Sequence, residues 1–96
     1  MRWIWDPAKD RANRRKHGLS FEIARLVFED PLALSRVDES ADEERWWTVG
    51  VIGQVTVFVV HTALRLDLRS GEETGRIISA RKATSHERKA YEEGQF

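Results

Sequence analysis

The strongest hydrophobic pattern lies in the middle of the chain, where two apolar stretches are separated by two turn residues. Residues 45–52 and 55–61 are rich in valine, tryptophan and other strand-forming residues, which predicts two β-strands. Gly53 and Gln54 between them predict a two-residue hairpin turn with glycine in its first position. Both strands carry apolar residues on both faces, so we expect them in the centre of a sheet.

Two helices are predicted before this hairpin. Asp6 followed by Pro7 is typical of a helix N-terminus and Gly18 of a C-terminus, which predicts a first helix over residues 7–17. Its only apolar positions are Ala8 and Ala12, so we expect a surface helix that rests on this narrow face.

The second helix follows Ser20, which is expected to cap it, and ends before Pro31 because the residue preceding a proline is disfavoured in the α region. Its apolar residues recur at helical spacing, which predicts the core helix. They are Phe21, Ala24, Val27 and Phe28, with Ile23 and Leu26 widening the stripe.

The remaining stretches complete an α+β pattern. Short strands are expected at residues 3–5, at 32–37 on a sheet edge and at 76–81, and residues 38–44 form an acidic loop. Leu64 to Gly75 mixes charges with glycines and is expected to be an extended hairpin tip or a mobile loop.

Thr84 and Glu87 have the spacing of a capping box and predict a last helix that ends near Gly94. The predicted order is a short N-terminal strand, two helices, an antiparallel four-stranded β-meander and a C-terminal helix. A chain of 96 residues has material for one core, so one domain over residues 1–96 is expected.

Composition favours a cytoplasmic protein. The chain contains no cysteine, which suits a reducing compartment, and its apolar stretches are too short for a signal peptide or a membrane span. The 16 basic and 16 acidic residues balance, but their distribution is uneven. Residues 1–18 carry six basic and two acidic side chains, whereas residues 19–50 carry three and eight. A polyanion is therefore expected to bind a local basic surface.

Several kinds of chemistry lack their motifs. His17, His61 and His86 are far apart and match no metal-binding spacing, and the acidic loop lacks the spacing of a calcium site. There is no nucleophile elbow, no cysteine nucleophile and no glycine-rich phosphate loop, so neither a metal nor a cofactor is expected.

Cationic residues near the ends of the predicted elements remain, and they suit phosphate chemistry. Metal-free RNA cleavage needs a base for the 2′-hydroxyl, an acid for the leaving 5′-oxygen and fixed positive charge on the phosphoryl oxygens. The candidates are Lys16, His17, Arg45, Arg76, Arg81 and Lys82.

Most candidates have a structural alternative. His17 suits a helix C-terminus through the helix dipole, and Arg45 has Glu43 and Glu44 as possible ion-pair partners. Strict alternation places Arg76 and Arg81 on opposite faces of a strand, so both reach one site only if the strand ends or bulges between them.

Four further residues allow two interpretations. His61, at the end of an apolar strand, is either structural or catalytic. Tyr91 is either an acid or a packing residue of the last helix, and either Trp46 or Trp47 is a candidate for stacking on a base, with packing under a helix as the alternative.

Over nearly its whole length, the sequence resembles the BrnT toxin family. The matching segments are Trp5-Asp6, Lys9, Asn13, Lys16-His17-Gly18, Phe21, Ala24, Val27-Phe28, Asp30-Pro31, Asp42-Glu43-Glu44-Arg45-Trp46, Gly50, residues 76–84, Glu87-Arg88 and Tyr91. The segment 76–84 is the most specific. Residues 64–75 depart from the short glycine-centred turn of the family.

The resemblance implies a RelE-like fold and an endoribonuclease toxin of a type II toxin–antitoxin pair that halts translation. It also implies a BrnA-like ribbon-helix-helix antitoxin as partner, through which alone operator DNA is bound. On this hypothesis Arg76 and Arg81 stabilise the phosphate, His17 or an arginine transfers the proton, and Arg45 is a further catalytic candidate without an assigned role. Lys16, Lys82 and Arg88 hold the RNA backbone. The alternative is a non-catalytic module that binds antitoxin or nucleic acid.

Overall fold

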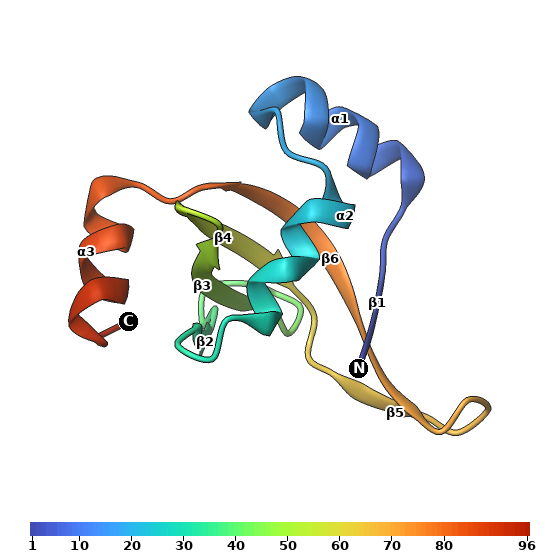
Figure 1. Cartoon of the computed structure of the whole chain (residues 1–96). Helices are drawn as coiled ribbons and strands as arrows, with labels where there is room; N and C mark the ends of the chain where they lie inside the picture. Colours follow the sequence, from blue (N-terminus) through green and yellow to red (C-terminus); the bar gives the residue numbers. More distant parts are fainter.

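Six strands form one sheet in the order β1-β6-β4-β3-β2, with β5 paired to β6 (Figure 1). The computed structural model describes all residues from 1 to 96. The strands are β1 (Arg2–Ile4), β2 (Leu34–Val37), β3 (Trp46–Ile52), β4 (Val55–His61), β5 (Arg65–Asp67) and β6 (Glu72–Lys82). The predicted antiparallel meander is present as β2-β3-β4-β6 with β3 and β4 in its interior, and β1 adds a parallel pairing with β6. The α+β prediction is therefore confirmed.

The helices begin and end where their capping residues predict. Helix α1 (Pro7–His17) starts with the Asp6 carboxylate accepting from the Ala8 amide at 2.8 Å and ends at Gly18, whose φ is 69°. Helix α3 (Ser85–Glu93) starts with both hydrogen bonds of the Thr84–Glu87 capping box. These local interactions are independent of the rest of the fold, which is why they are visible in the sequence.

The second predicted helix changes its geometry halfway. Helix α2 (Phe21–Ala24) is α-helical and continues as a 3-10 helix, η1 (Arg25–Glu29). Phe21, Ala24 and Val27 are fully buried, as expected for the core helix. Ile23 does not widen the buried stripe, because it is 47% exposed.

The main core lies between this helical segment and one face of the sheet. Its sheet residues are Val57 and Val59 of β4 and Ile77 and Ala80 of β6. We call this side the helical face and the opposite side the open face. Gly50 of β3 also lies on the helical face, where a β-carbon would be 2.6 Å from a methyl group of Val27. The close approach of η1 to the sheet therefore requires glycine there.

Helix α1 contacts the sheet through polar groups. The prediction that it rests on Ala8 and Ala12 is wrong, since both are exposed and Asn13 is its one buried residue. The Asn13 amide donates to the Ala80 carbonyl at 2.8 Å and accepts from the Ala80 amide at 3.1 Å. The Asp10 carboxylate accepts from the Phe21 amide at 2.9 Å. The apolar pattern missed this face because its contacts are hydrogen bonds.

The segment from Leu64 to Gly75 is a protruding hairpin (Figure 1). It contains β5 and the first residues of β6, so the last strand begins at Glu72 and not at residue 76 as predicted. Gly71 in the turn has a φ of 73°. Of the two expectations for this stretch, the hairpin tip is confirmed.

A bulge in β6 sets the direction of its arginines. Val60 of β4 pairs with Ser79, but the next residue, His61, pairs with Ile77, so Ile78 is an extra residue in β6. Ile77 and Ala80 consequently both face the core although they are three positions apart. Their neighbours Arg76 and Arg81 are thereby brought to the same face, the open one.

No helix of this structure combines the length and the apolar character needed to cross a membrane.

Candidate functional site

Arginines from three segments of the chain reach the open face. Arg36 of β2 lies opposite Trp47 of β3, and Arg81 of β6 lies opposite Phe58 of β4. Arg45 precedes β3 by one residue, two positions before Trp47, so alternation places it on the same face. The sheet thus presents a cationic surface around two aromatic rings.

Arg81 is held in a defined position on this surface. Its guanidinium forms a bidentate ion pair with the Glu87 carboxylate, with N···O distances of 2.8 and 3.0 Å, and lies 4.3 Å from the centroid of the Phe58 ring. The hydrogen bond that Arg81 donates to Glu87 raises the pKa of Arg81. Burial opposes ionisation of Glu87, but hydrogen bonds from Arg81 and the Thr84 amide outweigh it and lower the pKa of Glu87. Both groups are therefore charged at neutral pH.

The capping box of α3 connects this ion pair to the backbone. Glu87 Oε1 accepts from the Thr84 amide at 2.8 Å, and the same oxygen accepts from Arg81. Helix α3 is thereby oriented so that His86, in its first turn, also faces the sheet. One glutamate thus fixes both the helix and the arginine.

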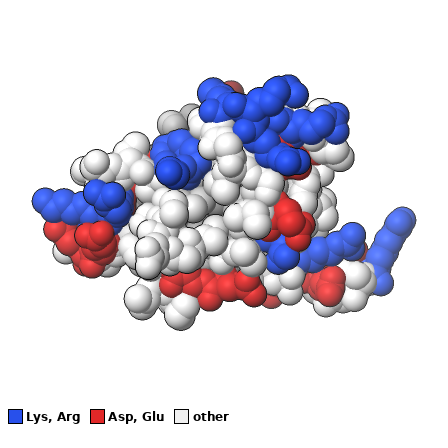
Figure 2. Space-filling model, turned by 45° about the horizontal axis from the view of Figure 1, so that its top comes forward, with Lys and Arg blue, Asp and Glu red and all other residues white.

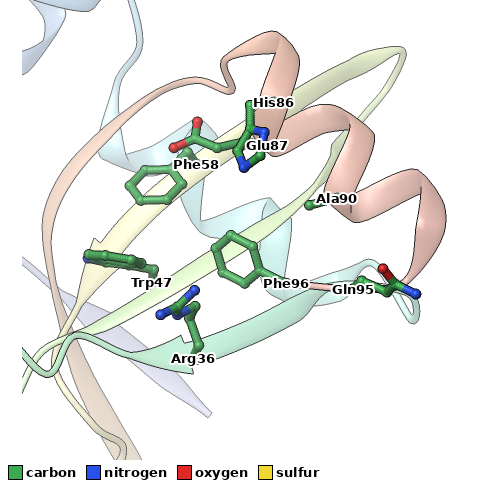
Figure 3. Close-up of a pocket in the computed structure, with 8 residues that line it drawn as sticks. All are labelled: Arg36, Trp47, Phe58, His86, Glu87, Ala90, Gln95 and Phe96. Carbon is green, nitrogen blue, oxygen red and sulfur yellow. The ribbon is translucent and has the colours of Figure 1, made fainter.

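A cavity of about 230 Å³ lies between the sheet and α3 (Figure 3). In Figure 3 the rings of Trp47, Phe58 and Phe96 surround it, with Arg36 below and the first turn of α3 above. It is lined by Arg36, Trp47, Phe58, His86, Glu87, Ala90, Gln95 and Phe96. The cavity combines aromatic walls with charged groups of both signs.

Arg45 does not form the ion pair considered from the sequence. Glu44 pairs instead with Arg65 at 3.7 Å, and no carboxylate lies within ion-pair distance of Arg45. The pKa of Asp38 is lowered, first by a hydrogen bond from Ser40 and also by the charge of Arg45. The Arg45 Nε is buried without a hydrogen-bond partner. This guanidinium therefore has donor capacity that the protein does not use.

The other predicted site residues lie elsewhere. Lys82 pairs with Val57 and points to the helical face, where it and His17 line a cavity of about 200 Å³ with Leu19 and Val55. Lys16 is exposed at the end of α1. Arg88 of α3 is exposed and lies 3.9 Å from Glu92. Arg45, Arg76 and Arg81 thus share the open face, whereas His17 and Lys82 meet on the helical face.

Helix α1 carries a second cationic surface, shown at the top of Figure 2. Its basic residues are all exposed and none takes part in an ion pair. They are Lys9, Arg11, Arg14, Arg15 and Lys16. The hollow beside the helix is lined by three of them and Gly18, with no hydrophobic residue. The helix dipole favours the cations of the last turn but not Lys9 or Arg11.

His61 and Tyr91 have structural contacts. His61 is 6% exposed, and burial lowers its pKa, so its ring is neutral at pH 7. Its Nδ1–H donates to the Thr62 carbonyl at 2.8 Å, which leaves Nε2 to accept from the Thr48 hydroxyl at 2.6 Å. The Tyr91 hydroxyl donates to Asp30 at 2.6 Å, and this bond raises the pKa of Tyr91 to about 12.

Three residues of the open face were missed by the sequence interpretation. Arg36 gave no signal, because its position opposite Trp47 depends on strand register. Glu87 was recognised only as a capping residue, although it also binds Arg81. His86 was considered only as a metal ligand, because its proximity to the sheet depends on tertiary packing. No group of three or more histidine or acidic side chains is arranged to hold a metal ion.

Comparison with known families identifies the chain. Residues 5–87 match the family model described as the ribonuclease toxin BrnT of type II toxin–antitoxin systems. No curated protein matches the chain significantly. The matched range includes α1, every strand from β2 to β6 and the Arg81–Glu87 ion pair. The chain therefore belongs to the BrnT family of ribonuclease toxins of type II toxin–antitoxin systems.

Proposed function

We propose that this protein is an endoribonuclease that cleaves RNA on the open face of its sheet without a metal ion. The observation that carries the proposal is the bulge in β6, because it brings Arg76 and Arg81 to the same face of the sheet, which also carries Arg45. Guanidinium groups bind phosphate oxygens in a bidentate manner and stay charged at every physiological pH. Their placement on one face suits the binding of an RNA phosphodiester, whose negative charge increases during cleavage.

The proposed reaction is an internal transfer. The 2′-oxygen attacks the adjacent phosphorus, the bond to the 5′-oxygen breaks, and a 2′,3′-cyclic phosphate remains on the upstream fragment. Arg76 and Arg81 stabilise the phosphoryl oxygens. The sequence predicted His17 as the proton-transfer group, but His17 lies on the helical face. We assign this role to His86, which lines the cavity beside Glu87. Its imidazole accepts the 2′-hydroxyl proton. Water protonates the leaving 5′-oxygen, and the hydroxide that forms takes the proton from His86, so that the imidazole is restored.

RNA-backbone binding is assigned to the cations outside this centre. Lys82 follows Arg81 directly but points to the helical face, so a strand that crosses the end of β6 meets both residues. Lys16 and its neighbours on α1 extend this surface, and Arg88 extends it on α3. Local surfaces of this kind attract a polyanion although the chain has no net charge.

Membership of the family supports the biological role that we propose. The toxin acts in the cytoplasm, where RNA cleavage inhibits translation, and a BrnA-like ribbon-helix-helix antitoxin neutralises it. Operator DNA is bound only through that antitoxin. The absence of cysteine is consistent with a reducing compartment.

One observation favours a second candidate, a non-catalytic module that binds antitoxin or nucleic acid. Two guanidinium nitrogens of Arg81 already donate to Glu87, which leaves fewer donors for a phosphate. Under the catalytic proposal the remaining donors, together with Arg76 and Arg45, contact the substrate.

Induction of the chain alone in bacteria distinguishes the two candidates. The catalytic proposal predicts growth arrest with RNA decay, and a loss of RNA cleavage by about a hundredfold or more in Arg81→Ala. Arg25→Ala is the matched control, because Arg25 forms an exposed ion pair with Glu22 on another surface. Normal growth with stable RNA, while the folded wild-type protein accumulates, would establish the non-catalytic module.

A further inference from the structure

We propose that the cavity between the sheet and α3 binds one nucleobase of RNA and selects guanine. This inference rests on the proposed function for its biological meaning, since it names the base beside the phosphate that Arg81 holds. Its physical basis is the set of groups around the cavity, and the binding of a free nucleotide tests it directly.

The walls of the cavity suit a flat aromatic ligand. The Trp47 and Phe58 rings have centroids 5.9 Å apart with planes inclined by 48°, and Phe96 approaches Phe58 edge-on at 6.4 Å. The volume of about 230 Å³ lies below the roughly 300 Å³ at which sites for drug-sized ligands begin. The space therefore suits a single base, and stacking on aromatic side chains is a common source of base affinity.

Arg36 provides unused hydrogen-bond donors at this cavity. Its guanidinium carbon lies 5.2 Å from the centroid of Trp47 and 6.0 Å from that of Phe96. It forms no ion pair, and its side chain has no hydrogen-bond acceptor in the protein. The aromatic rings thus hold the guanidinium while its N–H groups remain available. Figure 3 shows Arg36 and Glu87 on opposite sides of the cavity.

The two charged groups match the edges of guanine. An arginine binds the O6 and N7 acceptors of guanine in a bidentate manner. The N1–H and N2–H₂ groups of the same base are donors, and Glu87 Oε2, which accepts one hydrogen bond from Arg81, has a remaining acceptor position for one of them. Adenine presents its N6 amino donor where guanine has O6, so it opposes Arg36. Adenine therefore forms fewer hydrogen bonds at this site than guanine.

The position of the cavity also predicts where RNA is cut. Glu87 contacts the cavity and binds Arg81 through both carboxylate oxygens. A guanine beside Glu87 therefore has its sugar–phosphate close to the guanidinium assigned to the scissile phosphate. On this proposal, RNA is cleaved next to guanine.

Titration of the whole chain with 5′-GMP, 5′-AMP, 5′-CMP and 5′-UMP tests the site. Calorimetry measures affinity, and shifts of the Trp47 indole resonance locate the binding. We expect 5′-GMP to bind about tenfold or more tightly than 5′-AMP. Arg36→Gln and Arg36→Lys should both remove this preference, since neither side chain forms the bidentate contact. Arg69→Gln, at the exposed hairpin turn, is the control that should keep it.

Two outcomes overturn the inference: equal affinity for the four nucleotides, or a guanine preference that persists in folded Arg36→Gln. Failure of the proposed function is distinguishable from both. If RNA is not cleaved but Arg36-dependent binding of 5′-GMP is measured, the guanine site is supported and the proposed ribonuclease activity is refuted. If both the wild type and Arg36→Gln cut RNA equally beside all four bases, the ribonuclease activity is supported and the guanine site is refuted.

Discussion

Asn13 and Ala80 exchange two hydrogen bonds across the interface between α1 and β6, with the Asn13 side chain acting as both donor and acceptor. The parallel partner β1 pairs with β6 only as far as Arg76, so the outer edge of β6 has no strand beside Ala80. The side-chain amide of Asn13 forms the hydrogen bonds that a neighbouring strand would form there. It also donates to the Leu19 carbonyl at 2.9 Å, which fixes the chain entering α2.

Replacement of Asn13 by alanine should therefore destabilise the fold more than any other single change on α1. The buried Ala80 amide and carbonyl would lose their partner, and we expect a loss of about 3 kcal/mol of unfolding free energy. Urea denaturation measures it. Arg14→Ala, an exposed neighbour, is the control and should change stability by less than about 0.5 kcal/mol. An equal effect of the two variants would contradict this role of Asn13.

The Arg81–Glu87 ion pair should make stability depend on pH in the acid range. The pKa of Glu87 is lowered in the folded protein, so the contribution of the pair is present above the unfolded value of 4.5 and is lost as pH falls through the folded value. Because both groups are partly exposed, we expect only about 1 kcal/mol. Comparison of wild type with Glu87→Gln at pH 7 and pH 3 measures it. The variant should be less stable at pH 7, and the difference should shrink at pH 3.

The hydrogen bond between Tyr91 and Asp30 should make stability fall at high pH. The pKa of Tyr91 is raised to about 12, so its contribution is complete below the unfolded value of 10.0 and is lost as pH rises to about 12. Tyr91→Phe should cost about 1 kcal/mol at pH 7. Thermal unfolding at pH 7 and pH 11 tests this, because the variant should lack the additional alkaline loss. A parallel decline of both proteins would assign the loss to other groups.

Charge reversal on α1 should weaken RNA binding and its salt dependence together. Arg11 and Arg15 are one turn apart, exposed and without ion pairs. The double variant Arg11→Glu with Arg15→Glu should reduce the slope of log affinity against log salt by about 0.7 for each lost phosphate contact. A 2′-deoxy-substituted oligonucleotide prevents cleavage during the titration. Arg69→Glu is the control, and an unchanged slope in the double variant would remove α1 from the RNA-binding surface.

The helix ends were predictable because each depends on residues within one turn. The Asp6 and Ser20 side chains accept hydrogen bonds from the backbone amides two and three positions ahead. The side chains of Thr84 and Glu87 each accept from the backbone amide of the other residue. The Gly53–Gln54 turn was equally local, and φ at Gly53 is 63°. The contacts between α1 and the sheet and the pairing of β5 with β6 were harder to predict. In these segments hydrogen bonds or backbone pairing act without an apolar period.

The sequence pattern did not predict which face of the sheet each side chain occupies. Strands β3 and β4 are apolar on both sides, so period-two alternation did not tell which of Trp46 and Trp47 meets the helices. The bulge at Ile78 reverses the alternation that separates Arg76 from Arg81, and nothing in the local residues predicted it. The same register placed His17 and Lys82 on the side opposite Arg81.

The sequence by itself determined the helix caps, the central hairpin, the family and most of the elements, because these depend on neighbours along the chain. Tertiary structure alone decided which cations share a surface. That outcome depends on strand order, register and one extra residue in β6, and these are set by packing between segments that are distant in sequence.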